Sequence, residues 1–158
     1  MLSKLQSEHA TWVDREFPNQ PAYLPAIGMV EEAGELCHAL LKLQQLMLYG
    51  ADRRYSPAEL HADFVDAIGD CAIYACSYCN ATSYDFVCLL PYEKQEATPL
   101  ALSVQLVHAA ASFAEDHEHK HLYRYMAILQ SICDMSQINF AQAVLTTWAS
   151  VKQRKRIK

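Results

Sequence analysis

The segment GMVEEAGEL, from Gly28 to Leu36, places three glutamates among apolar residues. An α-helix turns about 100° per residue, so Glu31 and Glu35 lie about 40° apart and Glu32 lies about 100° from Glu31. The three carboxylates therefore share one arc of the helix, and apolar side chains occupy most of the remaining surface. This pattern predicts a largely buried helix over residues 23–49 that ends at a glycine.

The remainder of the chain carries further helical signals and no strand-like alternation of any length. Ser56 before Pro57, and Thr98 before Pro99, predict two more helix starts. The helices predicted from these signals and from apolar spacing cover residues 3–17, 23–49, 57–80, 99–114, 121–134 and 137–154. We therefore predict an all-α fold, a bundle of four to five main helices, formed by a single domain of residues 1–158.

The composition is that of an ordinary globular protein, with 52% hydrophobic and 20% charged residues in 158. No stretch approaches the ~20 apolar residues that a membrane-spanning helix needs. The first residues, MLSKLQSEHATW, lack the apolar run of a signal peptide. These features predict no membrane association and a cytoplasmic location.

The charge is unevenly distributed along the chain. The last seven residues, KQRKRIK, contain five of the thirteen basic residues, so the preceding chain carries eight basic against eighteen acidic side chains. Such an acidic body argues against a nucleic acid polymer as the partner, because phosphate backbones require a basic surface. Residues 155–158 are predicted to form a flexible basic tail that could reach a polyphosphate.

A second acidic stripe runs along DFVDAIGDCAIYACSYCN, where Asp63, Asp66 and Asp70 span about 60° of one helix face. No charged residue lies between Asp70 and Asp85, so we expect Asp70 to be at least partly buried. Buried carboxylates require a raised pKa, a basic partner or a metal ion. Because basic residues are scarce here and the donors are all oxygens, the pattern favours Mg²⁺ or Mn²⁺. The alternative is a solvated acidic face on each helix.

Two other groups of potential ligands are interpreted as structural. Cys76 and Cys79 form a lone CxxC with no second pair at zinc-binding spacing, so they are predicted to be buried thiols. His117, His119 and His121 alternate within a polar connection between helices, where we expect solvated histidines.

These residues also resemble a known family. GMVEEAGELCHAL resembles the EExxE motif of the MazG-type, all-α nucleoside triphosphate pyrophosphohydrolases, and DAIGDCAIY resembles their second motif, ExxD followed by an apolar run. Trp12 with Phe17, and the segment TWASVKQRK, resemble the two ends of such domains. The resemblance implies Mg²⁺-dependent hydrolysis of a nucleoside triphosphate to the monophosphate and pyrophosphate, by a homodimer or homotetramer.

The resemblance also implies roles for individual carboxylates. Its metal ligands correspond to Glu32, Glu35 and Asp70, with Asp66 as a fourth, and Glu31 is either a further ligand or a residue that orients the ligands. Glu32 or Glu35 would in addition accept the proton of the attacking water. Ala67 occupies the position of the ExxD glutamate, so Asp66 is the expected substitute, with Asp63 as the reserve.

For the substrate, the resemblance implies phosphate contacts from Lys152 and Arg154, which could otherwise be a cationic helix end. Trp12, Tyr74 and Tyr78 are candidates to stack on the base, with plain core aromatics as the alternative.

Two other functions remain open from the sequence. One is a relative that acts on phosphoribosyl-ATP. The other is a non-catalytic helical module that binds a nucleotide or a protein, with activity lost through Ala67. The sequence does not decide the preferred base or sugar.

Overall fold

The structure is a computed structural model that describes residues 1–50 and 55–154. These residues form six α-helices, one short 3₁₀ helix and no strand, which confirms the all-α prediction. The predicted count of four to five main helices is not confirmed, because six α-helices form, one in each of the six predicted ranges. The elements are α1 (Leu2–Glu16), α2 (Tyr23–Tyr49), α3 (Pro57–Ala81), η1 (Phe86–Leu89), α4 (Pro99–Asp116), α5 (His119–Met135) and α6 (Phe140–Val151). The predicted flexible tail lies outside the described residues.

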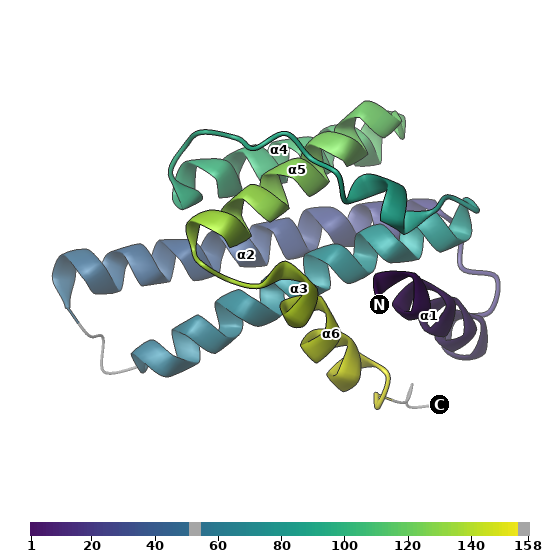
Figure 1. The fold of residues 1–158 in the computed structure, drawn as a ribbon, viewed down its shortest axis with the longest axis horizontal. Helices are drawn as coiled ribbons and strands as arrows, with labels where there is room; N and C mark the ends of the chain where they lie inside the picture. Colours follow the sequence, from purple (N-terminus) through teal and green to yellow (C-terminus); the bar gives the residue numbers. More distant parts are fainter. Residues whose placement is uncertain (51–54, 155–158) are drawn as a thin grey trace.

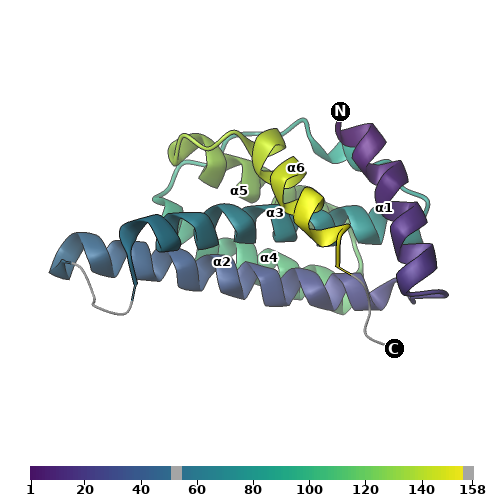
Figure 2. The same cartoon turned by 90° about the horizontal axis from the view of Figure 1, so that it is seen from below.

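The two longest helices, α2 and α3, form an antiparallel pair through the middle of the molecule (Figure 1). Helix α4 packs against α2, and α5 packs against α4 on the same side of this pair. Helices α6 and α1 pack against α3 on the opposite side (Figure 2). The helices that carry the predicted carboxylates are therefore covered on both sides, which explains why their apolar surface extends around most of each helix.

Hydrogen bonds from side chains fix the predicted helix starts. The hydroxyl of Ser56 accepts a hydrogen bond from the backbone N–H of Glu59, whose carboxylate accepts one in return from the backbone N–H of Ser56. Thr98 caps α4 through a single hydrogen bond, which its hydroxyl accepts from the backbone N–H of Ala101. The last helix begins three residues later than predicted, because Gln137 adopts a left-handed φ of 57° and cannot continue the helix.

Two glycines allow α3 to approach its neighbours closely. A Cβ atom at Gly28 on α2 would lie 2.1 Å from the ring of Tyr74 on α3. A Cβ atom at Gly69 on α3 would lie 2.1 Å from the hydroxyl oxygen of Thr147 on α6. These contacts bring the polar stripes of α2 and α3 close to each other and to the end of α6.

The cysteines follow the sequence prediction. All six are free thiols, and Cys71, Cys76, Cys79 and Cys133 are buried in the apolar core. Burial raises the pKa of Cys79 to about 12, so this thiol is protonated at neutral pH. The CxxC pair therefore contributes to packing as two small apolar side chains.

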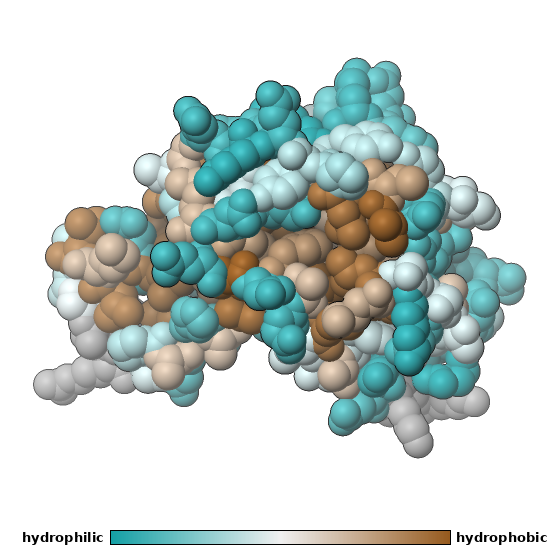
Figure 3. Space-filling view, viewed as in Figure 1, coloured by the Kyte–Doolittle hydropathy of each residue, from teal (hydrophilic) through white to brown (hydrophobic). Residues whose placement is uncertain are grey.

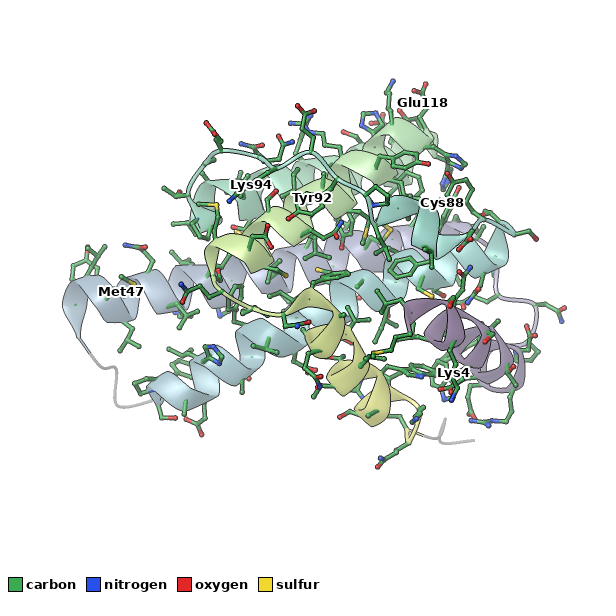
Figure 4. The ribbon with its side chains drawn as sticks, in the orientation of Figure 1. Lys4, Met47, Cys88, Tyr92, Lys94 and Glu118 are labelled. Carbon is green, nitrogen blue, oxygen red and sulfur yellow. The ribbon has the colours of Figure 1, made fainter. Side chains whose placement is uncertain are left out.

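Part of the surface is apolar. Met47, Leu48 and Tyr49 are all largely exposed at the free end of α2, where hydrophobic surface gathers (Figure 3). Met47 lies at the tip of this helix, far from α1 and its Lys4 (Figure 4). None of the helices in the described residues combines the length and apolarity that a membrane span requires.

Candidate functional site

Two cavities lie on either side of the carboxylates of α2 and α3. The aromatic cavity has a volume of about 340 Å³ and is lined by residues that include His9, Trp12, Phe17, Glu32, Asp70, Tyr74 and Arg154. The acidic cavity has a volume of about 530 Å³ and is lined by residues that include Glu31, Glu35, His38, Lys42, Asp63, Asp66 and Asp70. Asp70 lines both cavities, so it joins an aromatic recess to an acidic one.

The predicted ligand carboxylates all face this region, although they divide between the cavities. Glu32 opens towards the aromatic cavity, whereas Glu31, Glu35 and Asp66 line the acidic one. The hydroxyl of Thr147 on α6 donates a hydrogen bond of 3.0 Å to Oδ1 of Asp66 and so fixes that side chain. No sequence pattern indicated this contact, which joins residues 81 positions apart.

Burial and the crowding of negative charge raise the pKa values of the two least exposed candidate ligands. Burial, followed by the charge of Asp70 and of the neighbouring acids, raises the pKa of Glu32 to about 7. Burial, followed by the charge of Asp66, raises the pKa of Asp70 to about 6, although Arg154 opposes this shift. Oε2 of Glu32 is buried and has no hydrogen-bond partner among the described residues. A cation at this position would relieve both the repulsion and the unsatisfied oxygen.

The pKa shift of Glu32 gives a test in the metal-free protein. The folded chain keeps this proton up to about pH 7, whereas the unfolded chain releases it near 4.5. The folded state therefore binds more protons in this interval, so this group's contribution to the free energy of unfolding falls as the pH rises through it. We expect Glu32→Gln, measured by thermal unfolding in EDTA, to be several degrees more stable than the wild type at about pH 8 and equally stable at about pH 4. A stability difference that does not change with pH would contradict this assignment.

The candidate ligands suit Mg²⁺ both in their chemical type and in their open arrangement. All the candidate ligands are carboxylate oxygens, which hard cations prefer. No three of the described acidic groups on α2 and α3 bring their ligand atoms within 4.8 Å of one another, so the chain alone forms no closed cage there. Mg²⁺ is usually held by one or two carboxylates together with water and substrate phosphates, which matches such an open arrangement.

One other group of metal-ligand type occurs at the turn between α4 and α5. Asp116, Glu118 and His121 do bring one ligand atom each within 4.8 Å of one another. These side chains are already paired, because Nε2 of His121 lies 3.2 Å from Asp116 and Lys120 forms an ion pair with Glu118. Glu118 lies at the edge of the molecule (Figure 4), and none of these three residues lines either cavity. We assign these contacts to the helix–helix turn.

The alternating histidines are only in part the solvated residues that the sequence predicts, because His119 is exposed whereas His117 and His121 are partly buried. His117 adopts a left-handed φ of 57° at the end of α4, and its ring stacks on Tyr78 at 5.9 Å with an interplanar angle of 8°. His119 packs edge-on against Tyr84, with ring centroids 4.8 Å apart. Aromatic neighbours that are distant in sequence therefore cover part of this motif.

The predicted substrate contacts separate into two sets. Trp12, Tyr74 and Arg154 all line the aromatic cavity. Lys152 instead lies 3.9 Å from a carboxylate oxygen of Glu8, outside the cavity lining. Tyr78 is buried and packs edge-on against Phe113, with ring centroids 4.6 Å apart. The structure therefore gathers three of the five side chains around one recess and places Tyr78 in the core.

An aromatic cluster at this recess includes residues that the sequence analysis did not assign. The ring of His9 lies 6.0 Å from Trp12 and 5.2 Å from Trp148, which itself lies edge-on to Trp12 at 5.9 Å. His9 is only 2% exposed, and burial lowers its pKa to about 4, so the imidazole is neutral at physiological pH. A sequence signal for His9 did exist, because it precedes Trp12 by three residues and so shares its helix face.

Comparison of the chain with protein-family models, with curated proteins and with solved structures finds no match.

Proposed function

We propose that this protein is a Mg²⁺-dependent nucleoside triphosphate pyrophosphohydrolase of the MazG-like type. The observation that carries the proposal is the position of Asp70 between the two cavities. A nucleotide has the same two-part character, an aromatic base at one end and a polyanionic triphosphate at the other. Bound here, its base would occupy the aromatic cavity and its phosphates would reach the carboxylates.

The side chains around the cavities suit this orientation of the substrate. Trp12 and Tyr74 offer aromatic faces on which a base can stack. Arg154 lines the same cavity near Asp70, where a guanidinium can bind a phosphate through two hydrogen bonds. Carboxylates alone would repel a triphosphate, so the binding of substrate requires a cation between them.

The resemblance assigns the chemistry to the glutamates and aspartates of this region. Bound Mg²⁺ would neutralise charge on the phosphates and lower the pKa of the attacking water. Glu31, Glu32, Glu35, Asp66 and Asp70 are the proposed ligands. Glu32 or Glu35 would accept the water proton. The products would be a nucleoside monophosphate and pyrophosphate.

Location and assembly are part of the same proposal. The free cysteines fit a reducing compartment such as the cytoplasm, where nucleoside triphosphates and Mg²⁺ are available. The exposed apolar residues at the free end of α2 support the homodimer or homotetramer that the resemblance implies. Size-exclusion chromatography with light scattering would give the mass of the assembly.

The direct test is a pyrophosphate-release assay on the eight common ribo- and deoxyribonucleoside triphosphates. We expect pyrophosphate and the monophosphate from at least one of them in the presence of Mg²⁺, and none after addition of EDTA. Product analysis by anion-exchange chromatography separates this cleavage from release of orthophosphate. Orthophosphate as the first product, or turnover that survives EDTA, would contradict the proposal.

If the protein is inactive on all eight nucleotides, two further measurements distinguish the remaining alternatives. Release of pyrophosphate from phosphoribosyl-ATP would assign the more specialised reaction. If the folded protein still binds a nucleotide but cleaves none, the non-catalytic module becomes the better description.

A further inference from the structure

A polar contact joins the end of α3 to α1 beside the aromatic cavity. Nδ2 of Asn80 lies 3.2 Å from the backbone carbonyl oxygen of Gln6 and 3.1 Å from Nδ1 of His9. A carbonyl oxygen can only accept a hydrogen bond, so the atom of Asn80 at this position must be the amide nitrogen. That nitrogen carries two protons and can donate one to each neighbour.

The contact determines which nitrogen of His9 carries the proton. Because Nδ1 accepts from Asn80, the neutral imidazole must carry its proton on Nε2. Burial keeps the ring neutral, as its lowered pKa indicates. Nε2 has no hydrogen-bond partner among the described residues, although His9 lines the aromatic cavity. His9 therefore has one N–H donor to offer within this recess.

Trp12 supplies a second donor on the same wall. Its indole N–H can only donate, and Nε1 is buried with no hydrogen-bond partner among the described residues. Trp12 lies one helical turn from His9 on α1, and both residues line the aromatic cavity. A buried donor without a partner carries a free-energy cost, which a ligand that accepts a hydrogen bond would remove.

We propose that Asn80 is a positioning residue that holds His9 as an Nε2–H donor, so that His9 and Trp12 together bind acceptor atoms on the base of a nucleotide. The identity of the ligand rests on the proposed function, whereas the tautomer of His9 does not. A merely structural Asn80 would join α1 to α3 and have no effect on base recognition.

The tautomer can be measured without any nucleotide, by ¹⁵N NMR of protein labelled at histidine. We expect His9 in the wild type to carry its proton on Nε2 and to leave Nδ1 unprotonated. In Asn80→Leu we expect the proton to be shared between the two nitrogens. Detection of the proton on Nδ1 in the wild type, or an unchanged spectrum in Asn80→Leu, would overturn the positioning role.

Gln6→Ala is the matched structural control. The side chain of Gln6 accepts from the backbone N–H of Phe86 at 2.9 Å and donates to the carbonyl of Tyr84 at 2.8 Å, so it also joins α1 to the segment after α3. The side chain forms no hydrogen bond with His9 among the described residues, and the backbone carbonyl that Asn80 uses remains in the variant. We expect Gln6→Ala to lower stability while the tautomer of His9 stays as in the wild type.

Two probes separate base recognition from phosphate binding. By calorimetry with Mg²⁺, Asn80→Leu is expected to bind the α,β-imido analogue of the preferred nucleotide about tenfold more weakly than the wild type, the effect of one hydrogen bond. Binding of inorganic triphosphate, which has no base, should be unchanged. Equal losses for both probes would overturn the role in base recognition. If no nucleotide analogue binds to the wild type, the ligand assignment fails together with the proposed function, and the NMR result still decides the tautomer.

Discussion

Asp70→Asn should lower the rate of pyrophosphate release by about 1,000-fold, because it removes several kcal/mol of charge stabilisation from the transition state. Asp70 is the carboxylate that lines both cavities, so no neighbouring acid can take its place at their junction. The amide keeps the size of the side chain and removes its charge. Glu35→Gln should have an effect of the same order if Glu35 also holds the metal ion. Steady-state release of pyrophosphate at saturating Mg²⁺ measures both effects.

Stability separates this loss from misfolding. The raised pKa of Asp70 shows that its charge is unfavourable in the metal-free fold, so Asp70→Asn should be at least as stable as the wild type in EDTA. Mg²⁺ should raise the unfolding temperature of the wild type and not that of the variant. Glu115→Gln makes the same kind of change at an exposed position of α4, and it should leave activity and the Mg²⁺ response intact. If Asp70→Asn kept its activity, that result would contradict the proposed metal site.

Local signals in the sequence predicted the helices that carry this site. Helix α2 begins and ends at the predicted residues, Tyr23 and Tyr49, because apolar periodicity and the terminal Gly50 act within one segment. The capping box at Ser56 likewise depends on residues three positions apart. Such interactions involve residues that are close together in the sequence, so a single sequence is sufficient to detect them.

Contacts between distant segments could not be predicted in this way. Tyr74 and Tyr78 lie four residues apart on α3, yet the first lines the aromatic cavity and the second packs against Phe113 of α4. Their different surroundings depend on the positions of α1 and α4 in the fold, which helical periodicity does not determine. The same holds for the hydrogen bond between Asp66 and Thr147, since it requires α6 to be in place.

Gly69→Ala is expected to reduce the free energy of unfolding by about 1–3 kcal/mol, which is the usual cost of overpacking a core. The added methyl group would lie 2.1 Å from the hydroxyl oxygen of Thr147 and 2.4 Å from its Cβ, so α6 must move away from α3. Thr147 is 2% exposed and its β-branched side chain is stiff, so rotation of the side chain alone cannot relieve the contact. Denaturant unfolding in EDTA measures the change.

Gly34→Ala is the matched control, because it adds the same atom within a helix where nothing lies within 4 Å. There the gain in helix propensity should act alone and raise the stability by about 0.5–1 kcal/mol. The two Gly→Ala changes should therefore have opposite signs. Stabilisation by both would show that α6 does not pack on α3 at Gly69.

A double variant tests whether the contact between Gly69 and Thr147 also affects the candidate metal site. Thr147→Gly removes the atoms that the new methyl group would meet, so Gly69→Ala should cost less in its presence than alone. Thr147→Gly also deletes the hydrogen bond that fixes the side chain of Asp66. Relief of the packing contact should not return the Asp66 carboxylate to its position. We therefore expect Gly69→Ala to cost less stability in the Thr147→Gly protein than in the wild type, while the Mg²⁺ response of the double variant stays weaker than that of the wild type. A smaller cost of Gly69→Ala together with a wild-type Mg²⁺ response in the double variant would mean that Thr147 acts on the site through packing alone.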